Sequence, residues 1–203
     1  MKNFLSRIAS GILAGIMISI GGAIYLASEN KVIGAIMFCV GLISVCYKGC
    51  YLFTGRVCFL LDKHTKGDIS DLLLGLLGNF LGTLLIGLIV KNISNLSIVA
   101  STACAGKLAF SWWQWLLKGI MCGMLMYLAV SIFSENNKNP IGILFCIPTF
   151  ILAGFEHSIA DMFYFAVGGF TLDSVWFLLI VVLGNAIGGV FLPALKKIVE
   201  LRK

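Results

Sequence analysis

Three ionisable residues lie close together in a part of the chain that is otherwise apolar: Glu156, His157 and Asp161. An ionisable group at membrane depth costs roughly 2.5–3.5 kcal/mol on insertion scales, so such groups usually face a pathway or a protein partner. Histidine has an unperturbed pKa of about 6.5 and can share or exchange a proton near neutral pH. Gly154 precedes the cluster and favours a local break in the helix. The pattern predicts a bent membrane span with a functional histidine at the bend.

The composition places this cluster in a membrane protein. Of the 203 residues, 60% are hydrophobic and 12% are charged, which is more apolar surface than a soluble domain of this size could bury. The polar stretches are short, so we expect one membrane domain over residues 1–203. The net charge of +6 comes mostly from Lys and Arg at the ends of apolar runs, which favours membrane orientation over a nucleic-acid partner.

The seven cysteines and two histidines form no recognisable metal-binding or disulfide pattern. No cysteine pair has CxxC spacing, and only His64 and His157 could supply an imidazole ligand. We therefore expect buried, unpaired cysteines, no metal and no cofactor. The sequence also contains no nucleophile elbow and no phosphate-binding glycine loop, so an enzyme is not expected.

Six apolar runs have the length of about 20 residues that a membrane span requires. They cover residues 8–27, 32–53, 69–90, 113–133, 141–165 and 175–195, and the second and fifth are expected to be interrupted. With cytoplasmic termini, nine Lys and Arg face the cytoplasm and three face the other side. This bias predicts a multi-pass protein of the cell (inner) membrane with both termini cytoplasmic. An outer aromatic belt is expected at Trp112, Trp113 and Trp115.

The sequence contains an internal repeat, with one copy at about residues 1–95 and the other at about 108–203. Three motifs recur in the same order: Gly11-x-x-x-Gly15 with Gly119-x-x-x-Gly123, Phe53-Thr54-Gly55 with Phe155-Glu156-His157, and Gly78-Asn79-x-x-Gly82 with Gly184-Asn185-x-x-Gly188. Three spans per half require the second half to be inverted, and inverted repeats with two broken helices are typical of proteins that move small solutes. The GxxxG spacing in the four unbroken spans predicts close helix packing.

Several motifs resemble the formate–nitrite transporter family. They are Leu52-Phe53-Thr54-Gly55, Gly78-Asn79, Lys118-Gly119-Ile120-Met121-Cys122, Leu128-Ala129-Val130, the Gly-Phe-Glu-His-Ser-Ile-Ala-Asp-Met element at 154–162, and the Gly-Asn-Ala-Ile-Gly-Gly element at 184–189. The resemblance implies an all-α, aquaporin-like protomer of six transmembrane helices, and a homopentamer with one pore per protomer. It also implies passage of small monovalent anions or their acids, such as formate, nitrite, hydrosulfide, acetate or lactate.

The resemblance also implies roles for single residues. Thr54 matches a threonine in the loop of the second span, and His157 matches the central histidine of the family. Lys107 lies twelve residues before Gly119 and matches a lysine of the outer vestibule.

The chain departs from the family pattern at three positions. The family often has Glu and Asn where this chain has Tyr51 and Arg56, and it usually has Asn at the position of Gly123. Arg56 has two interpretations. It either raises the anion concentration at the inner mouth or pairs with Asp62 at the cytoplasmic surface.

These residues suggest a transport hypothesis. A bare anion in a narrow apolar pore loses its hydration at a prohibitive cost. We expect Lys107 to draw the anion in, and the anion to become a neutral acid near His157, with the proton coming from His157 or from water. Thr54 would offer its hydroxyl to the solute. Constrictions are expected at Phe53, Phe155 and Leu52.

Four other polar residues are expected to support the structure. Glu156 is expected to hold its loop or a neighbouring protomer, Asp161 to be structural, and Asn79 and Asn185 to cap or join the half-helices. A structural role is also the alternative for His157. The alternative function is an aquaglyceroporin-like pore for small neutral solutes, although neither half contains Asn-Pro-Ala. The expected partners are a small anion, the lipid bilayer and further copies of this chain.

Overall fold

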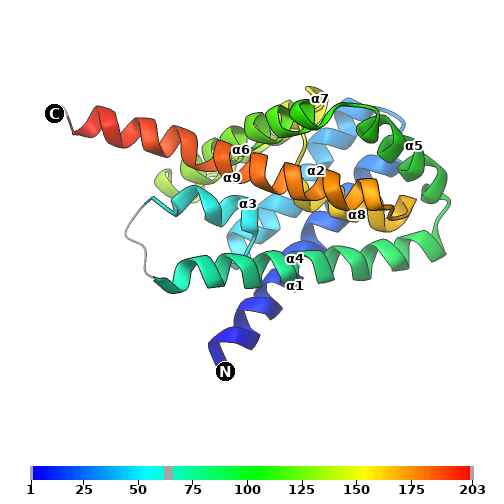
Figure 1. Ribbon diagram of the computed structural model, residues 1–203, viewed down its shortest axis with the longest axis horizontal. Helices are drawn as coiled ribbons and strands as arrows, with labels where there is room; N and C mark the ends of the chain where they lie inside the picture. The colour runs from blue at the N-terminus through cyan, green and yellow to red at the C-terminus, as the bar shows by residue number, and fades with distance from the viewer. Residues whose placement is uncertain (1, 62–65, 202–203) are drawn as a thin grey trace.

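The computed structural model describes residues 2–61 and 66–201, and all regular elements within these ranges are helices (Figure 1). In chain order they are α1 (Lys2–Ala27), α2 (Lys31–Lys48), α3 (Phe53–Arg56), the 3-10 helix η1 (Val57–Phe59), α4 (Lys66–Ile93), α5 (Leu96–Leu108), α6 (Trp112–Glu135), α7 (Ile141–Leu152), α8 (Ser158–Gly168) and α9 (Leu172–Glu200). The all-helical fold is as expected from the sequence.

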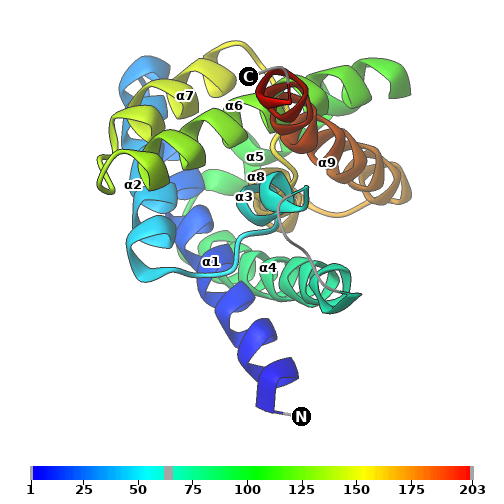
Figure 2. The ribbon, with the colours of Figure 1, turned by 90° about the vertical axis from the view of Figure 1, so that its left-hand side faces the viewer.

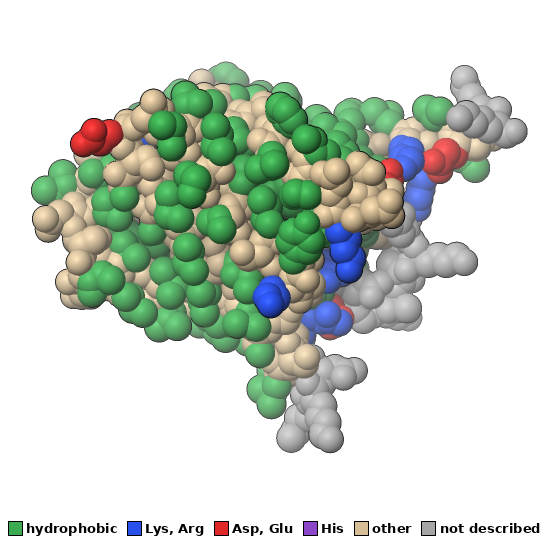
Figure 3. All heavy atoms as spheres, turned by 180° about the vertical axis from the view of Figure 1, so that it is seen from behind, with side chains coloured by type: hydrophobic (Ala, Val, Ile, Leu, Met, Phe, Trp, Pro, Cys, Tyr) green, Lys and Arg blue, Asp and Glu red, His purple; other side chains and the backbone are tan. Residues whose placement is uncertain are grey.

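Five of these helices, α1, α2, α4, α6 and α9, are long and apolar enough to cross a membrane. Their outward side chains are largely apolar, and Figure 3 shows hydrophobic groups over most of one face. The second expected span, residues 32–53, is too long, because α2 ends at Lys48. The fifth, residues 141–165, was expected to be interrupted, and the structure has two shorter helices there, α7 and α8.

α2 and α7 end with the same backbone geometry. Gly49 after α2 has φ 65° and Gly154 after α7 has φ 71°, in the left-handed region where glycine carries no side-chain penalty. The residue after each glycine donates its N–H to a carbonyl five residues back, Cys50 to Val45 at 3.0 Å and Phe155 to Phe150 at 2.9 Å. This is a Schellman-type helix end, and it turns the chain toward the centre of the molecule.

Two buried asparagines hold the segments that follow these glycines. The Asn79 amide donates to the carbonyls of Gly11 and Tyr51 at 2.8 Å each, and its Oδ1 accepts from the Phe53 N–H at 2.9 Å. Each asparagine is fully buried. The side chain therefore ties α1, the 49–52 segment and the start of α3 to α4.

Asn185 makes the matching set of hydrogen bonds in the second half. It donates to the carbonyls of Gly119 at 2.9 Å and Glu156 at 2.8 Å, and it accepts from the Ser158 N–H at 2.9 Å. By these bonds the structural counterpart of Phe53 is Ser158. The sequence comparison had paired Phe53 with Phe155, three residues earlier. The expected interruption at Phe53-Thr54-Gly55 is thus wrong, since these residues are helical in α3 and the non-helical segment is 49–52.

The glycine pairs bring long helices into backbone contact. In α1 and α4, a Cβ on Gly15 would collide with the Asn79 carbonyl oxygen, and one on Gly82 with that of Ile12. In α6 and α9, a Cβ on Gly188 would collide with the Ile120 carbonyl oxygen. α1 with α4 and α6 with α9 are the two most extensive helix contacts in the described part of the chain. The close packing predicted from GxxxG is confirmed.

The short helices α3 and α8 lie in the centre, with the longer helices around them (Figure 2). Residues 158–167 of α8 are all buried, against α4 and α5 above all. All seven cysteines are free, and all except Cys46 are buried. The interior therefore surrounds the non-helical segment that carries His157.

Candidate functional site

His157 is the residue immediately before α8, and both ring nitrogens are engaged. Nδ1 accepts a hydrogen bond from the Ala160 N–H at 3.1 Å, as an N-cap group does. Nε2 lies 2.8 Å from Thr54 Oγ1. Since Nδ1 is an acceptor, a neutral ring carries its proton on Nε2 and donates it to Thr54. His157 also stacks on Phe150, with ring centroids 5.6 Å apart.

The contact between Thr54 and His157 lies next to two cavities, although Thr54 itself lines neither. The first, which we call the Lys107 cavity, has a volume of about 370 Å³ and is lined by His157, Lys107 and Phe150 among others. The second, the Arg56 cavity, has about 190 Å³ and is lined by residues on both sides of Thr54, including Leu52, Gly55 and Arg56. Thr54 itself is fully buried and His157 is 3% exposed. A buried polar contact therefore adjoins two spaces that can hold a small solute.

Four charged side chains meet in the Lys107 cavity. The ammonium of Lys107 forms ion pairs with Glu156, its closest carboxylate, and with Asp161 Oδ1 at 2.9 Å. Lys118 Nζ lies 3.8 Å from the other oxygen of Glu156. Lys107 is 19% exposed and both carboxylates are almost fully buried. The formal charges of the two lysines and two carboxylates cancel.

Lys107 reaches the site because it lies in the last turn of α5, a helix that was not predicted. The Nε1–H of Trp115 donates to the Lys107 carbonyl at 2.9 Å and fixes this turn. Trp115 is only 8% exposed and its ring packs edge-on against Phe177. The expectation of a surface aromatic belt is therefore wrong for Trp115, whereas Trp112 and Trp113 are exposed.

Arg56 lies in the last turn of α3 and is exposed. Its Nη2 donates to the Gly49 carbonyl at a long 3.5 Å, and its guanidinium stands 5.3 Å from the centre of the Tyr51 ring. Arg7, paired with Asp71 at 2.6 Å, stands 4.7 Å from the same ring. Asp62, the proposed partner of Arg56, and His64 lie outside the described residues.

The three expected constriction residues occupy different places. Leu52 is 2% exposed and lines the Arg56 cavity. Phe155 lines the Lys107 cavity. Phe53 is buried, but it is not among the residues that line either cavity.

Phe150 and Lys118 are among the lining residues that sequence reasoning missed. Phe150 contacts the imidazole of His157, and its position seven residues before the histidine gave no distinctive signal. Lys118 was noted only as the first residue of a family motif, with no role assigned to it. Its ammonium lies 3.4 Å from the centre of the Phe110 ring and faces Glu156. A lysine inside an apolar run was the available signal.

Membrane-length helices around two cavities, with a buried polar contact beside them, are typical of a membrane transport protein. The family described as formate/nitrite transporter matches residues 1–199. The chain is 29% identical to a probable formate transporter of Methanothermobacter thermautotrophicus (92% of this chain, 85% of the relative). It is 28% identical to the nitrite transporter NirC of Salmonella typhimurium (93% and 81%). A solved pentameric formate channel with formate bound has the same fold, with a TM-score of 0.85 at 23% identity over 98% of both chains.

The chain therefore belongs to the formate/nitrite transporter family. It is a multi-pass membrane protein of a family of anion channels and transporters. The relatives are transporters and channels rather than enzymes, which confirms the expectation of a transport protein.

Proposed function

We propose that the chain carries small monovalent weak-acid anions across a membrane, with formate and nitrite as the leading candidates and hydrosulfide and short carboxylates as further ones. The observation that carries this proposal is the Thr54–His157 hydrogen bond of 2.8 Å next to two cavities. Membership of the formate/nitrite transporter family supports the choice of anions.

The anion crosses the centre as its neutral acid. Stripping water from a bare anion without compensation is prohibitive in an apolar constriction, and protonation removes that cost. The ring of His157 is held neutral by the Ala160 N–H at Nδ1, so a second ring proton would break that bond. In this mechanism water in the Lys107 cavity supplies the proton, and proton and anion cross together.

His157 and Thr54 act as hydrogen-bonding groups for the passing acid. The Nε2–H of His157 is available as a donor when the solute replaces Thr54 Oγ1 as its acceptor. The Thr54 hydroxyl, which accepts from His157, keeps its own proton to donate. Leu52 and Phe150 on either side exclude water from this point.

The assembly and orientation follow the same proposal. Two inverted repeats, each with a helix broken near the centre, are supported by the matching hydrogen bonds of Asn79 and Asn185. A homopentamer with one pore per protomer is supported by the fold shared with a pentameric channel. The excess of Lys and Arg near the termini supports cytoplasmic termini in the cell (inner) membrane.

Flux into proteoliposomes containing a pH-sensitive dye tests the proposal. Formate, nitrite, hydrosulfide, acetate and lactate are supplied from about pH 5 to 8, with His157→Asn and Thr54→Val beside the unmodified chain. Each lost hydrogen bond is worth about 0.5–1.5 kcal/mol, so the flux falls up to about tenfold. Thr149→Val is the matched control, because the Thr149 hydroxyl is exposed and donates to its own helix.

The outcomes separate the candidate functions. Selective anion flux that is altered in both site variants and unaltered in Thr149→Val supports the proposal. Unchanged anion flux in His157→Asn leaves a transporter with a structural histidine. If a folded pentamer moves glycerol and none of these anions, the aquaglyceroporin-like alternative replaces the proposal.

A further inference from the structure

We propose that the anion is captured at Arg56, in the smaller cavity, and that the guanidinium of Arg56 selects planar anions with two oxygens. This inference rests on the proposed function, because it assumes that a small anion crosses the protein. It names the binding group and predicts that the two faces of the membrane protein differ in apparent affinity.

The first step is that both lysines of the Lys107 cavity lie close to carboxylates. Lys107 contacts both Glu156 and Asp161, and Lys118 lies 3.8 Å from Glu156. Both carboxylates are within 3% of full burial, so water screens these ion pairs weakly. An arriving anion would have to displace a carboxylate from Lys107. The cavity therefore accepts a solute without attracting its charge.

The second step is that the Arg56 cavity contains a cation without a described counterion. Arg56 is the single charged residue among those that line it. Among the side chains that the structure describes, those of residues 4–61 and 69–201, no ion pair involves Arg56. Its only described hydrogen bond is the long one to the Gly49 carbonyl. Most of the five N–H donors of the guanidinium are therefore left for a ligand.

The third step is the shape of the group. A guanidinium is planar and offers two parallel N–H bonds to two oxygens of one anion, which an ammonium cannot do. The guanidinium carbon lies over the Tyr51 ring, 5.3 Å from the ring centre, within the range of a cation–π contact. The matching ligands are planar two-oxygen anions such as formate and nitrite. Hydrosulfide has no second acceptor atom for the fork.

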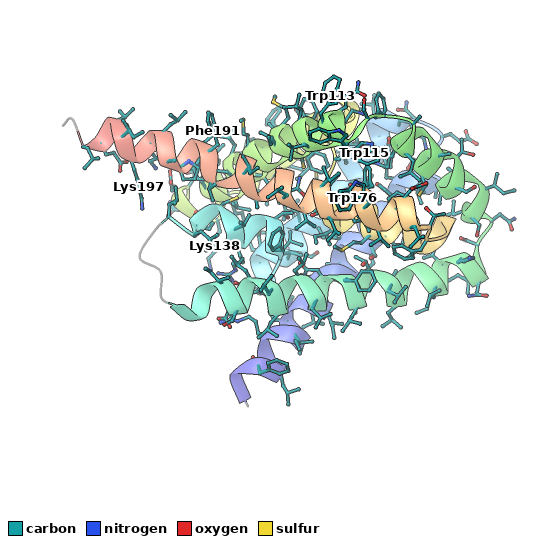
Figure 4. All side chains as sticks on the ribbon, viewed as in Figure 1. Trp113, Trp115, Lys138, Trp176, Phe191 and Lys197 are labelled. Atoms are coloured by element: carbon teal, nitrogen blue, oxygen red, sulfur yellow. The ribbon has the colours of Figure 1, made fainter. Side chains whose placement is uncertain are left out.

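The fourth step is the electrostatic potential around the Arg56 cavity. Basic side chains gather at the end of the molecule that carries both termini (Figure 3), where Figure 4 labels Lys138 and Lys197. Arg7 and Asp71 line a neighbouring cavity together with Arg56, and Lys48 directly precedes Gly49 of the Arg56 cavity. A third cavity, which shares Phe59 with these two, is lined by Lys196, Lys197, Glu135 and Glu200. An excess of one sign beside a narrow cavity raises the local concentration of the opposite charge.

The test measures initial flux against anion concentration from each face separately. The full chain is reconstituted in proteoliposomes, and its orientation is determined from the accessibility of a C-terminal tag. At low ionic strength the half-saturating formate concentration is lower at the face that bears Arg56. Arg56→Gln raises it about fivefold at that face alone, the effect of one unit charge across about 4 Å of water. The difference in half-saturating concentration between the two faces shrinks above about 0.15 M salt.

Two further variants separate shape from charge. Arg56→Lys keeps the charge and loses the fork, so the half-saturating concentration rises for formate and nitrite and not for hydrosulfide. Lys138→Gln removes a charge from the same end, away from the cavity lining, and changes the formate value less than twofold. Equal effects of Arg56→Lys on all anions, or equal half-saturation at both faces, would overturn the inference.

Asp62, which the structure does not describe, is tested directly. If Arg56 captures the anion, Asp62→Asn leaves the half-saturating concentration unchanged. A several-fold fall in Asp62→Asn would mean that Asp62 normally neutralises Arg56, and the inference is then wrong. Absence of any anion flux in the unmodified chain instead defeats the proposed function, so the two failures are distinct.

Discussion

Asn79 and Asn185 each hold a non-helical segment in place, and replacing either by alanine tests how the site is built. Asn79→Ala removes one acceptor and two donor bonds, which join α4 to Phe53, Tyr51 and Gly11. Asn185→Ala removes the matching bonds to Ser158, Glu156 and Gly119. If the two asparagines contribute equally to stability, the two variants lower the free energy of unfolding by similar amounts.

The size of the loss follows from the groups left without partners. Gly11 lies inside α1 and Gly119 inside α6, so their carbonyls keep a helical partner. In each half two buried backbone groups lose their asparagine partner: the first N–H of the short helix, Phe53 or Ser158, and one carbonyl of the segment before it. Each such group costs about 1–3 kcal/mol, which gives about 2–6 kcal/mol per variant. For a chain of this size that lowers Tm by at least about 4 °C.

Thermal unfolding in detergent, followed by tryptophan fluorescence, measures the loss. Trp115 is 8% exposed and packs on Phe177, so it reports on the interior near the site. Asn92→Ala is the control, because the Asn92 side chain donates to its own helix at an exposed position, and it should cost within about 0.5 kcal/mol. A Tm for Asn79→Ala equal to that of the control would refute the reasoning. So would a large loss in one half and none in the other.

Two further predictions concern packing and access. Gly188→Ala drives a Cβ into the Ile120 carbonyl and should lower the free energy of unfolding by about 1–3 kcal/mol. A Cβ on Gly106 meets nothing within 4 Å, so Gly106→Ala should stabilise α5 by up to about 1 kcal/mol. Equal shifts in Tm for the two variants would contradict this prediction. A small methanethiosulfonate reagent should modify Cys46, which is half-buried and lines the Arg56 cavity, long before the fully buried Cys122. Mass spectrometry of the timed reaction checks the order, and equal rates would show that the interior opens.

Much of the architecture could be predicted because burial in a bilayer leaves a direct mark on sequence. Long apolar runs located α1, α4, α6 and α9, and ionisable residues within such runs located the segment of His157. The sequence also showed that α4 and α9 carry an asparagine at equivalent positions, Asn79 and Asn185. The roles assigned to His157, Thr54 and Lys107 in transport stay predictions.

The chain break near α3 could not be located from local sequence. Glycines occur at 41, 49 and 55 in this region, and nothing local distinguishes the one that adopts φ 65°. That choice depends on Asn79, a contact across 26 residues. The neutralisation of Lys107 was equally hidden, because it depends on carboxylates about fifty residues away that only the packing of α5 against α8 brings near.

The glycine-to-backbone contacts restrict which parts of the protein can move. Where α6 meets α9, and α1 meets α4, no side chain lies between the helices at the glycines to act as a deformable layer. Sliding one helix along its partner would press a neighbouring Cβ into the opposing carbonyl, so each pair behaves as one stiff body. If the proposed pathway opens and closes, the segments 49–52 and 153–157 are the parts near its centre that are left to move.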